Sequence, residues 1–241
     1  MKIILTGLLW AMVASGASAQ QAPDIPRFST MTAGAAPQEW KHVPLSSFKK
    51  HTDYVLVTDD GVVVLRAIAH GSASGLLFKT QFDPHQFPML SWRWKVAQGI
   101  PDADNADPTK EDSPVRVMVG FDGDTSKLSL KDKFASSTAQ TASGHALPYA
   151  LLMYIWGNKV PVDSVTISSR TSRIRMLALS ADDKGIGKWQ SFTRNLVEDY
   201  KRVFKEEPGN VTSIELLTDT DNTVGDAEAY YGDISVGLPR P

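Results

Sequence analysis

The stretch YVLVTDDGVVVLRAIAH, residues 54–70, decides the class of fold. Two runs rich in β-branched residues, 54–58 and 62–70, flank the pair Asp60-Gly61. A two-residue hairpin turn needs positive φ angles at its central residues, and an Asp-Gly pair meets that need at low cost. The stretch therefore predicts two antiparallel strands joined by a tight turn.

Further runs that alternate apolar and polar residues follow along the chain, and this pattern is typical of strands. They are LSWRWKV (90–96), VRVMVGF (115–121), YALLMYIW (149–156), RIRMLALS (173–180), TSIELLT (212–218) and AYYGDISV (229–236). Helical spacing is clear only near residues 195–205, where Asn195 can cap a helix and Glu198 follows three residues later. We therefore expect an all-β fold, a jelly-roll β-sandwich of two antiparallel sheets with one short helix near residues 195–205.

The first 19 residues have the features of a secretory signal peptide. Lys2 supplies a positive charge, residues 3–13 form an apolar run, and Ala17-Ser18-Ala19 fits a cleavage site. Cleavage near Ala19 would make the protein periplasmic or secreted. No later run has the roughly 20 apolar residues that a bilayer crossing needs, so we expect no transmembrane segment.

The mature chain is expected to have two parts. Residues 20–38 are rich in Gln, Ala, Pro, Ser and Thr and predict a flexible N-terminal arm. Residues 39–238 predict a single β-sandwich domain. Two connections are long: residues 98–113 are acidic, and residues 122–146, rich in Ser, Thr, Ala and Lys, predict a mobile loop.

Composition limits the classes of site and partner. The 241 residues contain no cysteine, so neither a disulfide nor a thiolate metal ligand is available, and burial must stabilise the fold. The formal net charge is −2 and forms no basic stripe, which argues against a nucleic-acid partner. The five histidines lack the close spacing of a zinc site. They are His42, His51, His70, His85 and His145.

Calcium prefers oxygen ligands, and two segments offer them. One is the loop with Asp102, Asp104, Asn105 and Asp107, and the other is TDTDNT, residues 218–223, with Asp219, Asp221 and Asn222. Neither has the glycine and the glutamate that an EF-hand requires. Two interpretations stay open: the side chains bind calcium together with distant strands, or they cap turns through Asx hydrogen bonds.

Signals of catalysis are weak. The stretch GSASG, residues 71–75, resembles a nucleophile elbow but has Ala73 at the centre, so it predicts a flexible connection between strands. The pair Asp219 and Asp221 would serve a hydrolase only if its carboxylates had a suitable separation, which the sequence does not define.

Aromatic side chains are candidates for ligand contact. Trp92 and Trp94 share one face of a strand, and Arg93 and Lys95 alternate with them, so we expect both tryptophans to point inward. Tyr149, Trp156 and Trp189 are the aromatic residues that we consider for stacking against a sugar ring.

Arginines within apolar strands are the last unusual feature. Arg116 and Arg173 interrupt runs of β-forming residues, and a buried arginine needs a carboxylate partner. The candidate partners are Asp112, Asp219, Asp221 and Asp233. We therefore predict one polar cluster, either a calcium site or an arginine-carboxylate network.

The order of these motifs resembles the DUF3047 family of exported bacterial proteins of unknown function. The resemblance covers about residues 40–236 and rests on SWRWKV, Glu111-Asp112 before VRVMVGF, LPYALLMYIW, RIRMLAL, GKWQSFTRNLVEDYKRVF, LLTDTDNT and AYYGDISV. This chain departs from the family pattern at Glu111, where an aspartate is common, and at Lys205, where a glycine is common.

The resemblance implies a jelly roll of the galactose-binding, carbohydrate-module type. In such folds an aspartate of the last strand, here Asp233, can help to hold a structural calcium. We therefore expect an exported, non-catalytic binding protein for a carbohydrate or another cell-envelope component. The expected ligand-binding residues are Asp112, Arg116, Tyr149, Trp156, Arg173, Trp189 and Asn222, and the expected calcium ligands are Asp219, Asp221 and Asp233.

Two alternatives from other classes remain. One is a hydrolase that acts on envelope polysaccharide or lipid through Asp219 and Asp221. The other is a structural module that binds another exported protein, for which a large exposed apolar patch would be the sign.

Overall fold

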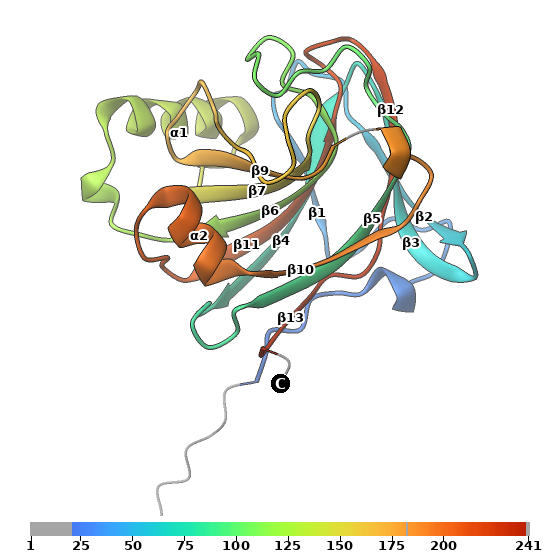
Figure 1. The fold of residues 1–241 in the computed structure, drawn as a ribbon, viewed down its shortest axis with the longest axis horizontal. Coiled ribbons are helices and arrows are strands. Elements are labelled where there is room, and N and C mark those ends of the chain that lie inside the picture. The colour runs from blue at the N-terminus through green and yellow to red at the C-terminus, as the bar shows by residue number, and fades with distance from the viewer. Residues whose placement is uncertain (1–20, 182, 240–241) are drawn as a thin grey trace, which may run out of the picture.

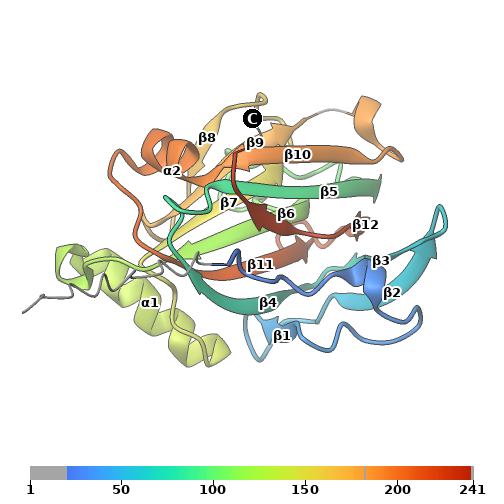
Figure 2. The same ribbon diagram turned by 90° about the horizontal axis from the view of Figure 1, so that it is seen from below.

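The computed structural model describes residues 21–181 and 183–239, so the predicted signal peptide lies outside the described residues. Two curved sheets face each other and enclose the core, and both α-helices lie at the same end of the sandwich (Figures 1 and 2). The fold is the all-β jelly-roll sandwich that the sequence predicts. In the described part of the chain, neither helix is long and apolar enough to cross a membrane.

The first sheet has seven strands in the order β1-β4-β11-β6-β7-β9-β8. Their bounds are β1 Lys41–Pro44, β4 Ala73–Phe82, β11 Val211–Asp219, β6 Ser113–Phe121, β7 Ala150–Trp156, β9 Ile174–Ser180 and β8 Val165–Ile167. Both faces of β6 and β7 are buried. These two strands are therefore the centre of the sandwich.

The second sheet has six strands in the order β10-β5-β12-β3-β2, with β13 paired to β5. Their bounds are β10 Gln190–Asn195, β5 Met89–Gln98, β12 Asp226–Tyr231, β3 Val62–His70, β2 Asp53–Asp59 and β13 Ser235–Gly237. One face of this sheet packs on the first sheet, and the other face is outward.

The predicted hairpin is confirmed. Asp59 of β2 pairs with Val62 of β3, which leaves Asp60 and Gly61 as the two turn residues. Their φ angles are 51° and 79°, as a primed two-residue turn requires.

Four strands were not expected from alternation, namely β1, β4, β8 and β10. The most important is β4, because it lies inside the first sheet between β1 and β11. The prediction of a flexible connection at residues 71–75 is wrong from Ala73 onward, since β4 begins there. A side chain at Gly75 would lie 2.6 Å from the Leu216 carbonyl oxygen, so glycine allows the neighbouring strand to approach.

One pair of strands departs from the expected antiparallel sheets. β7 and β9 run parallel, with Leu151 opposite Ile174 and Tyr154 opposite Leu177. The connection between them contains β8, which pairs antiparallel with β9 at the edge of the sheet.

The predicted helix near residues 195–205 is confirmed as α2, Leu196–Phe204. The Asn195 side-chain oxygen accepts from the amides of Val197 and Glu198, and its side-chain amide donates to Glu198. The helix ends at Lys205 in the left-handed region, with a φ of 63°. Glycine adopts that conformation without strain, whereas lysine does not.

The expectation of a mobile loop at residues 122–146 needs correction. This segment contains the 3-10 helix η2 (Thr125–Lys127) and the helix α1, Leu130–Ser143. Ser129 caps α1, and Asp132 connects the helix to the residues before β9, accepting from Thr171 Oγ1 at 2.6 Å and Ser172 N at 2.9 Å. The composition suggested mobility because α1 places few apolar residues against the sheets.

The segment expected to be a flexible arm packs against the second sheet. It contains the 3-10 helix η1 (Phe28–Thr30), and Ile25 and Phe28 belong to the main core. Gly34 donates to the Leu56 carbonyl, and Leu56 donates back to the Ala35 carbonyl. The described part of the arm is therefore a component of the domain.

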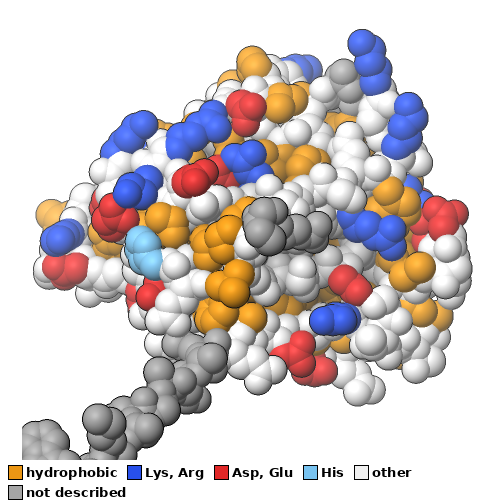
Figure 3. All heavy atoms as spheres, turned by 60° about the horizontal axis from the view of Figure 1, so that its bottom comes forward, with side chains coloured by type: hydrophobic (Ala, Val, Ile, Leu, Met, Phe, Trp, Pro, Cys, Tyr) orange, Lys and Arg blue, Asp and Glu red, His pale blue; other side chains and the backbone are white. Residues whose placement is uncertain are grey.

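The main core lies between the sheets and includes Trp92, Trp94 and Tyr154. A third 3-10 helix, η3 (Asp183–Gly185), precedes β10. Figure 3 shows the face at the lower end of Figure 1, where basic and acidic side chains are interspersed and no continuous basic area is visible.

Candidate functional site

The TDTDNT stretch begins at the end of β11 and continues into the turn before β12. Asp219 is the last residue of β11 and lies opposite Ser113 of β6. Thr218 Oγ1 donates to the Pro114 carbonyl and shares a hydrogen bond with the hydroxyl of Tyr231, which belongs to the other sheet. This stretch therefore joins the two sheets.

Arg116 and Asp219 form the buried centre of a polar network. Arg116 is 1% exposed, and its guanidinium donates to both carboxylate oxygens of Asp219 at 3.0 and 3.1 Å and to the Glu111 carbonyl at 2.7 Å. The Ser113 amide also donates to Asp219. The predicted pairing of Arg116 with one of the aspartates is thus present in the structure.

Asp112 holds the second half of the stretch. One of its oxygens accepts from the Asn222 amide, and the other accepts from the amide and the hydroxyl of Thr223 at 2.8 and 2.7 Å. Asp221 pairs with Lys49. All the carboxylates of this cluster therefore have donors from the protein.

The donor set decides between the two interpretations of the cluster. Asp112, Asp219 and Asp221 each place one oxygen within 4.8 Å of the others, and such oxygens suit calcium. However, Arg116 and Lys49 already supply two positive charges to these carboxylates. The structure therefore fits an arginine-carboxylate network better than a calcium site.

Burial dominates the protonation of Asp219. Desolvation raises the pKa of Asp219 to about 6, against the opposing effect of Arg116. Desolvation lowers the pKa of Arg116, but the charges of Asp219 and Glu111 outweigh it and leave that pKa above its ordinary value. The guanidinium therefore stays charged, and its partner is the group that responds to pH.

In the loop of residues 102–107, the Asx interpretation is confirmed for two residues. An Asp104 oxygen accepts from the Ala106 amide at 3.0 Å, and an Asp107 oxygen accepts from the amide and hydroxyl of Thr109. Asn105 is buried and donates to the Asp112 carbonyl. These side chains shape the loop.

The single cluster that the sequence predicted is divided in the structure. Asp233 accepts from the amide and hydroxyl of Ser29, and it is not in the group of close carboxylates. Arg173 belongs to a separate cluster beside α2, where it donates to Glu206 at 2.6 Å and to Tyr200 at 3.2 Å. Register within the sheets, which the sequence does not reveal, separates these residues.

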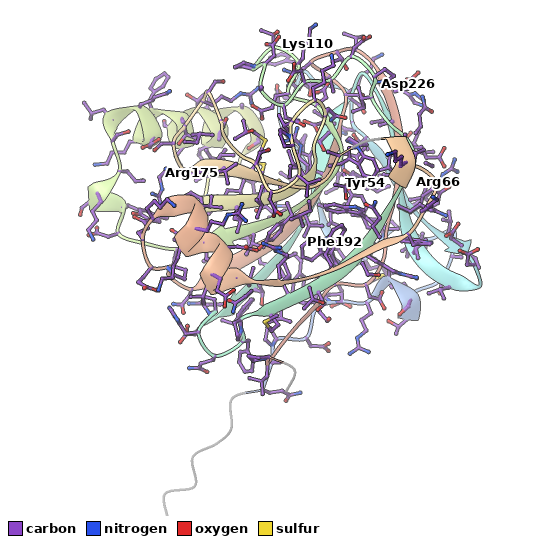
Figure 4. All side chains as sticks on the ribbon, viewed as in Figure 1. Tyr54, Arg66, Lys110, Arg175, Phe192 and Asp226 are labelled. Atoms are coloured by element: carbon purple, nitrogen blue, oxygen red, sulfur yellow. The ribbon has the colours of Figure 1, made fainter. Side chains whose placement is uncertain are left out.

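In Figure 4, Arg175, which follows Arg173 by two positions in the chain, lies beside α2, whereas Arg66 lies at the opposite side of the sandwich on the six-stranded sheet.

Two of the three candidate stacking residues have their rings covered. Trp156 is 4% exposed in the core, and a side chain at Gly185 would lie 2.8 Å from its ring. The Tyr149 ring has the Arg173 guanidinium 4.0 Å from its centroid, and an added Cβ at Gly123 would lie 2.2 Å from it. Trp156 offers no free ring face, and the Tyr149 ring already pairs with Arg173, so ligand stacking on these two residues has less support than on Trp189.

Trp189 differs because it lies on the outer face of the six-stranded sheet and is half-buried. Its indole N–H donates to Asp59 at 2.8 Å, and the Arg93 guanidinium lies 4.3 Å from its ring centroid. Lys95 also binds Asp59 and lies 4.5 Å from the Tyr230 ring. Trp92 and Trp94 point into the core, as predicted from this alternation.

A hollow of about 470 Å³ opens beside Arg93. Its wall comes from β10, β5, the start of β3 and the segment at β13. The lining residues are Val62, Val63, Ser91, Trp92, Arg93, Ser191, Phe192, Thr193, Asp233 and Ser235. We call this set the Arg93 hollow.

The Arg93 hollow is rich in polar groups. Four side-chain hydroxyls, one carboxylate and one guanidinium line it, and the hydroxyls of Ser91 and Thr193 are 3.0 Å apart. Trp92 also contributes to the lining, although its side chain points into the core.

Sequence reasoning missed most of the Arg93 hollow. Ser91 and Arg93 occupy the alternate positions to Trp92 and Trp94, so their outward direction was available from the sequence. The residues of β10 gave no signal, because QSFTRN contains a single large apolar residue.

The fold and the Arg93 hollow define a β-sandwich protein with a hydroxyl-lined surface site. Residues 38–235 match the family model described as "Protein of unknown function (DUF3047)", and the chain belongs to this family. The comparison with curated proteins finds no match.

Solved structures are similar at low identity. An arabinose-bound α-L-arabinofuranosidase matches with 9% identity and a TM-score of 0.42, over 90% of this chain and 26% of that one, so this chain spans about a quarter of its length. The xyloglucanase domain of NopAA from Sinorhizobium fredii, in complex with cellobiose, matches with 10% identity and a TM-score of 0.43, over 82% and 92% of the chains. The cellulose-induced protein Cip1 matches with 9% identity and a TM-score of 0.40, over 86% and 95%. These values transfer neither substrate nor activity to this chain.

Proposed function

We propose that the protein is an exported, non-catalytic binding protein that recognises a carbohydrate of the cell envelope in the Arg93 hollow. The observation that carries the proposal is the lining of this hollow, where hydroxyls, a carboxylate and a guanidinium meet beside Trp189. Export rests on the signal-peptide pattern of residues 1–19.

The lining suits a polyhydroxy ligand. A sugar presents hydroxyls that both donate and accept, and Ser91, Thr193 and Asp233 offer matching groups. Arg93 adds a planar donor that can bind two ligand oxygens at once. The hollow lies within the range of roughly 300–1,000 Å³ that small-molecule sites occupy.

Trp189 extends the site with an aromatic surface. Arg93 lies 4.3 Å and Lys95 Nζ 5.3 Å from its ring centroid, and Asp59 accepts from its N–H, so the ring orientation is set before any ligand arrives. A rigid aromatic side chain provides apolar contact with little loss of conformational entropy. It is therefore the residue to test first for contact with the CH-rich face of a sugar ring.

The alternative of hydrolysis by Asp219 and Asp221 has less support. Asp219 is 5% exposed, and Arg116 occupies both of its oxygens. A glycosidase needs two carboxylates on either side of an accessible bond. This pair is directed into the network instead.

The test is retention of the exported form, residues 20–241, on an array of bacterial glycans. We expect retention of at least one glycan class, and a Trp189→Ala variant should bind that glycan about tenfold more weakly, as expected for the loss of one aromatic contact. Melting curves of both proteins should agree closely, because Trp189 is only half-buried.

The matched control is Phe48→Ala, which removes an aromatic side chain that is 97% exposed and distant in sequence from the hollow. This variant should bind like the native protein. Equal binding by the Trp189→Ala variant, or no retention on any glycan, would contradict the proposal and favour a protein partner.

A further inference from the structure

The fold brings together two histidines that are nine positions apart in the sequence. His42 lies in β1, and His51 precedes Thr52 and β2. Their ring centroids are 4.8 Å apart, the ring planes make an angle of 57°, and both residues are exposed. The absence of zinc-like spacing in the sequence therefore did not exclude a pair of imidazoles in space.

We propose that His42 and His51 form a two-imidazole site for a divalent transition-metal ion, with Cu²⁺ bound most tightly and water completing the coordination. Imidazole nitrogen suits copper, nickel and zinc, and among these ions copper forms the most stable complexes. This inference is independent of the carbohydrate proposal, because it concerns other residues and another class of ligand.

The separation of the rings agrees with shared coordination. A metal–nitrogen bond of about 2.0–2.1 Å places the ring centroid about 3.2 Å from the ion. Two rings that meet the ion at angles between square-planar and tetrahedral then have centroids about 4.5–5.2 Å apart. The observed distance of 4.8 Å lies within this interval.

Ser74 of β4 prepares one of the two ligands. Its hydroxyl oxygen lies 2.9 Å from His42 Nε2 and accepts from the Thr52 amide. When Nε2 donates its proton to this oxygen, the lone pair of Nδ1 is available to a metal ion, which is the outer-shell support that metal-binding histidines commonly have.

The second ligand is available and its backbone is held in place. Among the described residues, no side chain or backbone group forms a hydrogen bond with the His51 ring, which lies beside the His42 ring. The next residue, Thr52, is 2% exposed and donates to the Thr218 carbonyl at 2.8 Å. A fixed backbone at this position reduces the entropy lost when a metal binds.

The experiment is a calorimetric Cu²⁺ titration of the exported form, residues 20–241, without an affinity tag. The variants are His42→Gln, His51→Gln and the control His85→Gln, whose imidazole is exposed and has only a distant contact with Glu207 at 3.9 Å. Continuous-wave electron paramagnetic resonance of the copper-loaded protein reports how many nitrogens bind the ion.

We expect one Cu²⁺ equivalent with two coordinated imidazole nitrogens, and affinity at least tenfold lower in each of the two site variants. The His85→Gln control should agree with the native protein within twofold, and Mg²⁺ should produce no heat. Site variants that keep the native copper affinity, or a spectrum without two imidazole nitrogens, would overturn the proposal.

Discussion

The substitution Asp132→Asn should release α1 from the sheet and leave the remainder of the fold intact. Asp132 is 6% exposed, and its carboxylate accepts from Ser129 Oγ and Thr171 Oγ1 at 2.6 Å and from Ser172 N at 2.9 Å. Burial raises the pKa of Asp132, but these hydrogen bonds lower it more, to about 2. The ionised carboxylate therefore favours the docked helix.

The magnitude follows from this shift. A drop from 3.8 to about 2 corresponds to roughly 2 kcal/mol in favour of the docked, ionised state. Asparagine lacks the charge and has only one acceptor, so the opening equilibrium of α1 should increase by a factor of about 30. Because the folded pKa is depressed, this contribution is complete above pH 4 and is lost as the pH falls toward 2.

Hydrogen exchange monitored by mass spectrometry is the appropriate assay, because the opening is local. Peptides covering residues 130–143 should exchange much faster in Asp132→Asn at pH 7, whereas peptides from β6 and β7 should not change. The control Asp124→Asn removes an exposed carboxylate that caps only η2. Protection of α1 within twofold of the native value in the Asp132→Asn variant would refute this reasoning.

Three other substitutions or additions test the remaining parts of the structure. Arg116→Met should lower the free energy of unfolding by about 3 kcal/mol at pH 7, because it leaves the buried Asp219 carboxylate with the Ser113 amide as its donor. The loss should be smaller at pH 5, where the Asp219 carboxyl is protonated. Urea unfolding at the two pH values measures this, and a loss below about 1 kcal/mol at pH 7 would contradict it. Lys205→Gly should raise the free energy of unfolding by about 0.5–1 kcal/mol, because Lys205 has a φ of 63°, and an unchanged or lower melting temperature would show that the C-cap is unstrained. Calcium at millimolar concentration, or EDTA, should leave the melting temperature unchanged, since Arg116 and Lys49 already bind the carboxylates; a clear rise with calcium would restore the calcium site.

Local signals in the sequence predicted the local features of the fold. The Asp60-Gly61 turn, the Asn195 cap and the inward direction of Trp92 each depend on residues within a few positions of one another. By contrast, β4 was missed because its first four residues, ASGL, are buried without alternation and begin with residues typical of turns. The strand is defined by its partners β1 and β11, which are far away in the sequence.

The candidate sites depended on contacts of the same long range. The pairing of Arg116 with Asp219 was predictable in kind, because a buried arginine requires a carboxylate, but the choice among four aspartates was not. The contact between His42 and His51 results from the pairing of β1 with β4 and from the bonds of Thr52 to Ser74. Histidine spacing along the chain carries no information about this strand pairing or about these hydrogen bonds.

The stretches that carry the family resemblance divide into two groups, according to whether contacts within the fold account for their side chains. In LLTDTDNT, the side chains of Thr218, Asp219 and Thr223 bind other parts of the protein, so the fold itself accounts for them. In SWRWKV, the core accounts for Trp92 and Trp94 but not for the outward Ser91 and Arg93.

As in SWRWKV, outward polar side chains are found in two further stretches, GKWQSFTRNL and YYGDISV. Their residues Ser191, Thr193, Asp233 and Ser235 line the Arg93 hollow together with Ser91 and Arg93, and Trp189 stacks on Arg93. Three segments that are distant in the sequence thus converge with polar side chains, and except for Asp233, which binds Ser29, core packing does not account for them. Convergence of this kind is expected of a binding site on a rigid scaffold, and it is the reason to direct the first substitutions to the Arg93 hollow and not to TDTDNT.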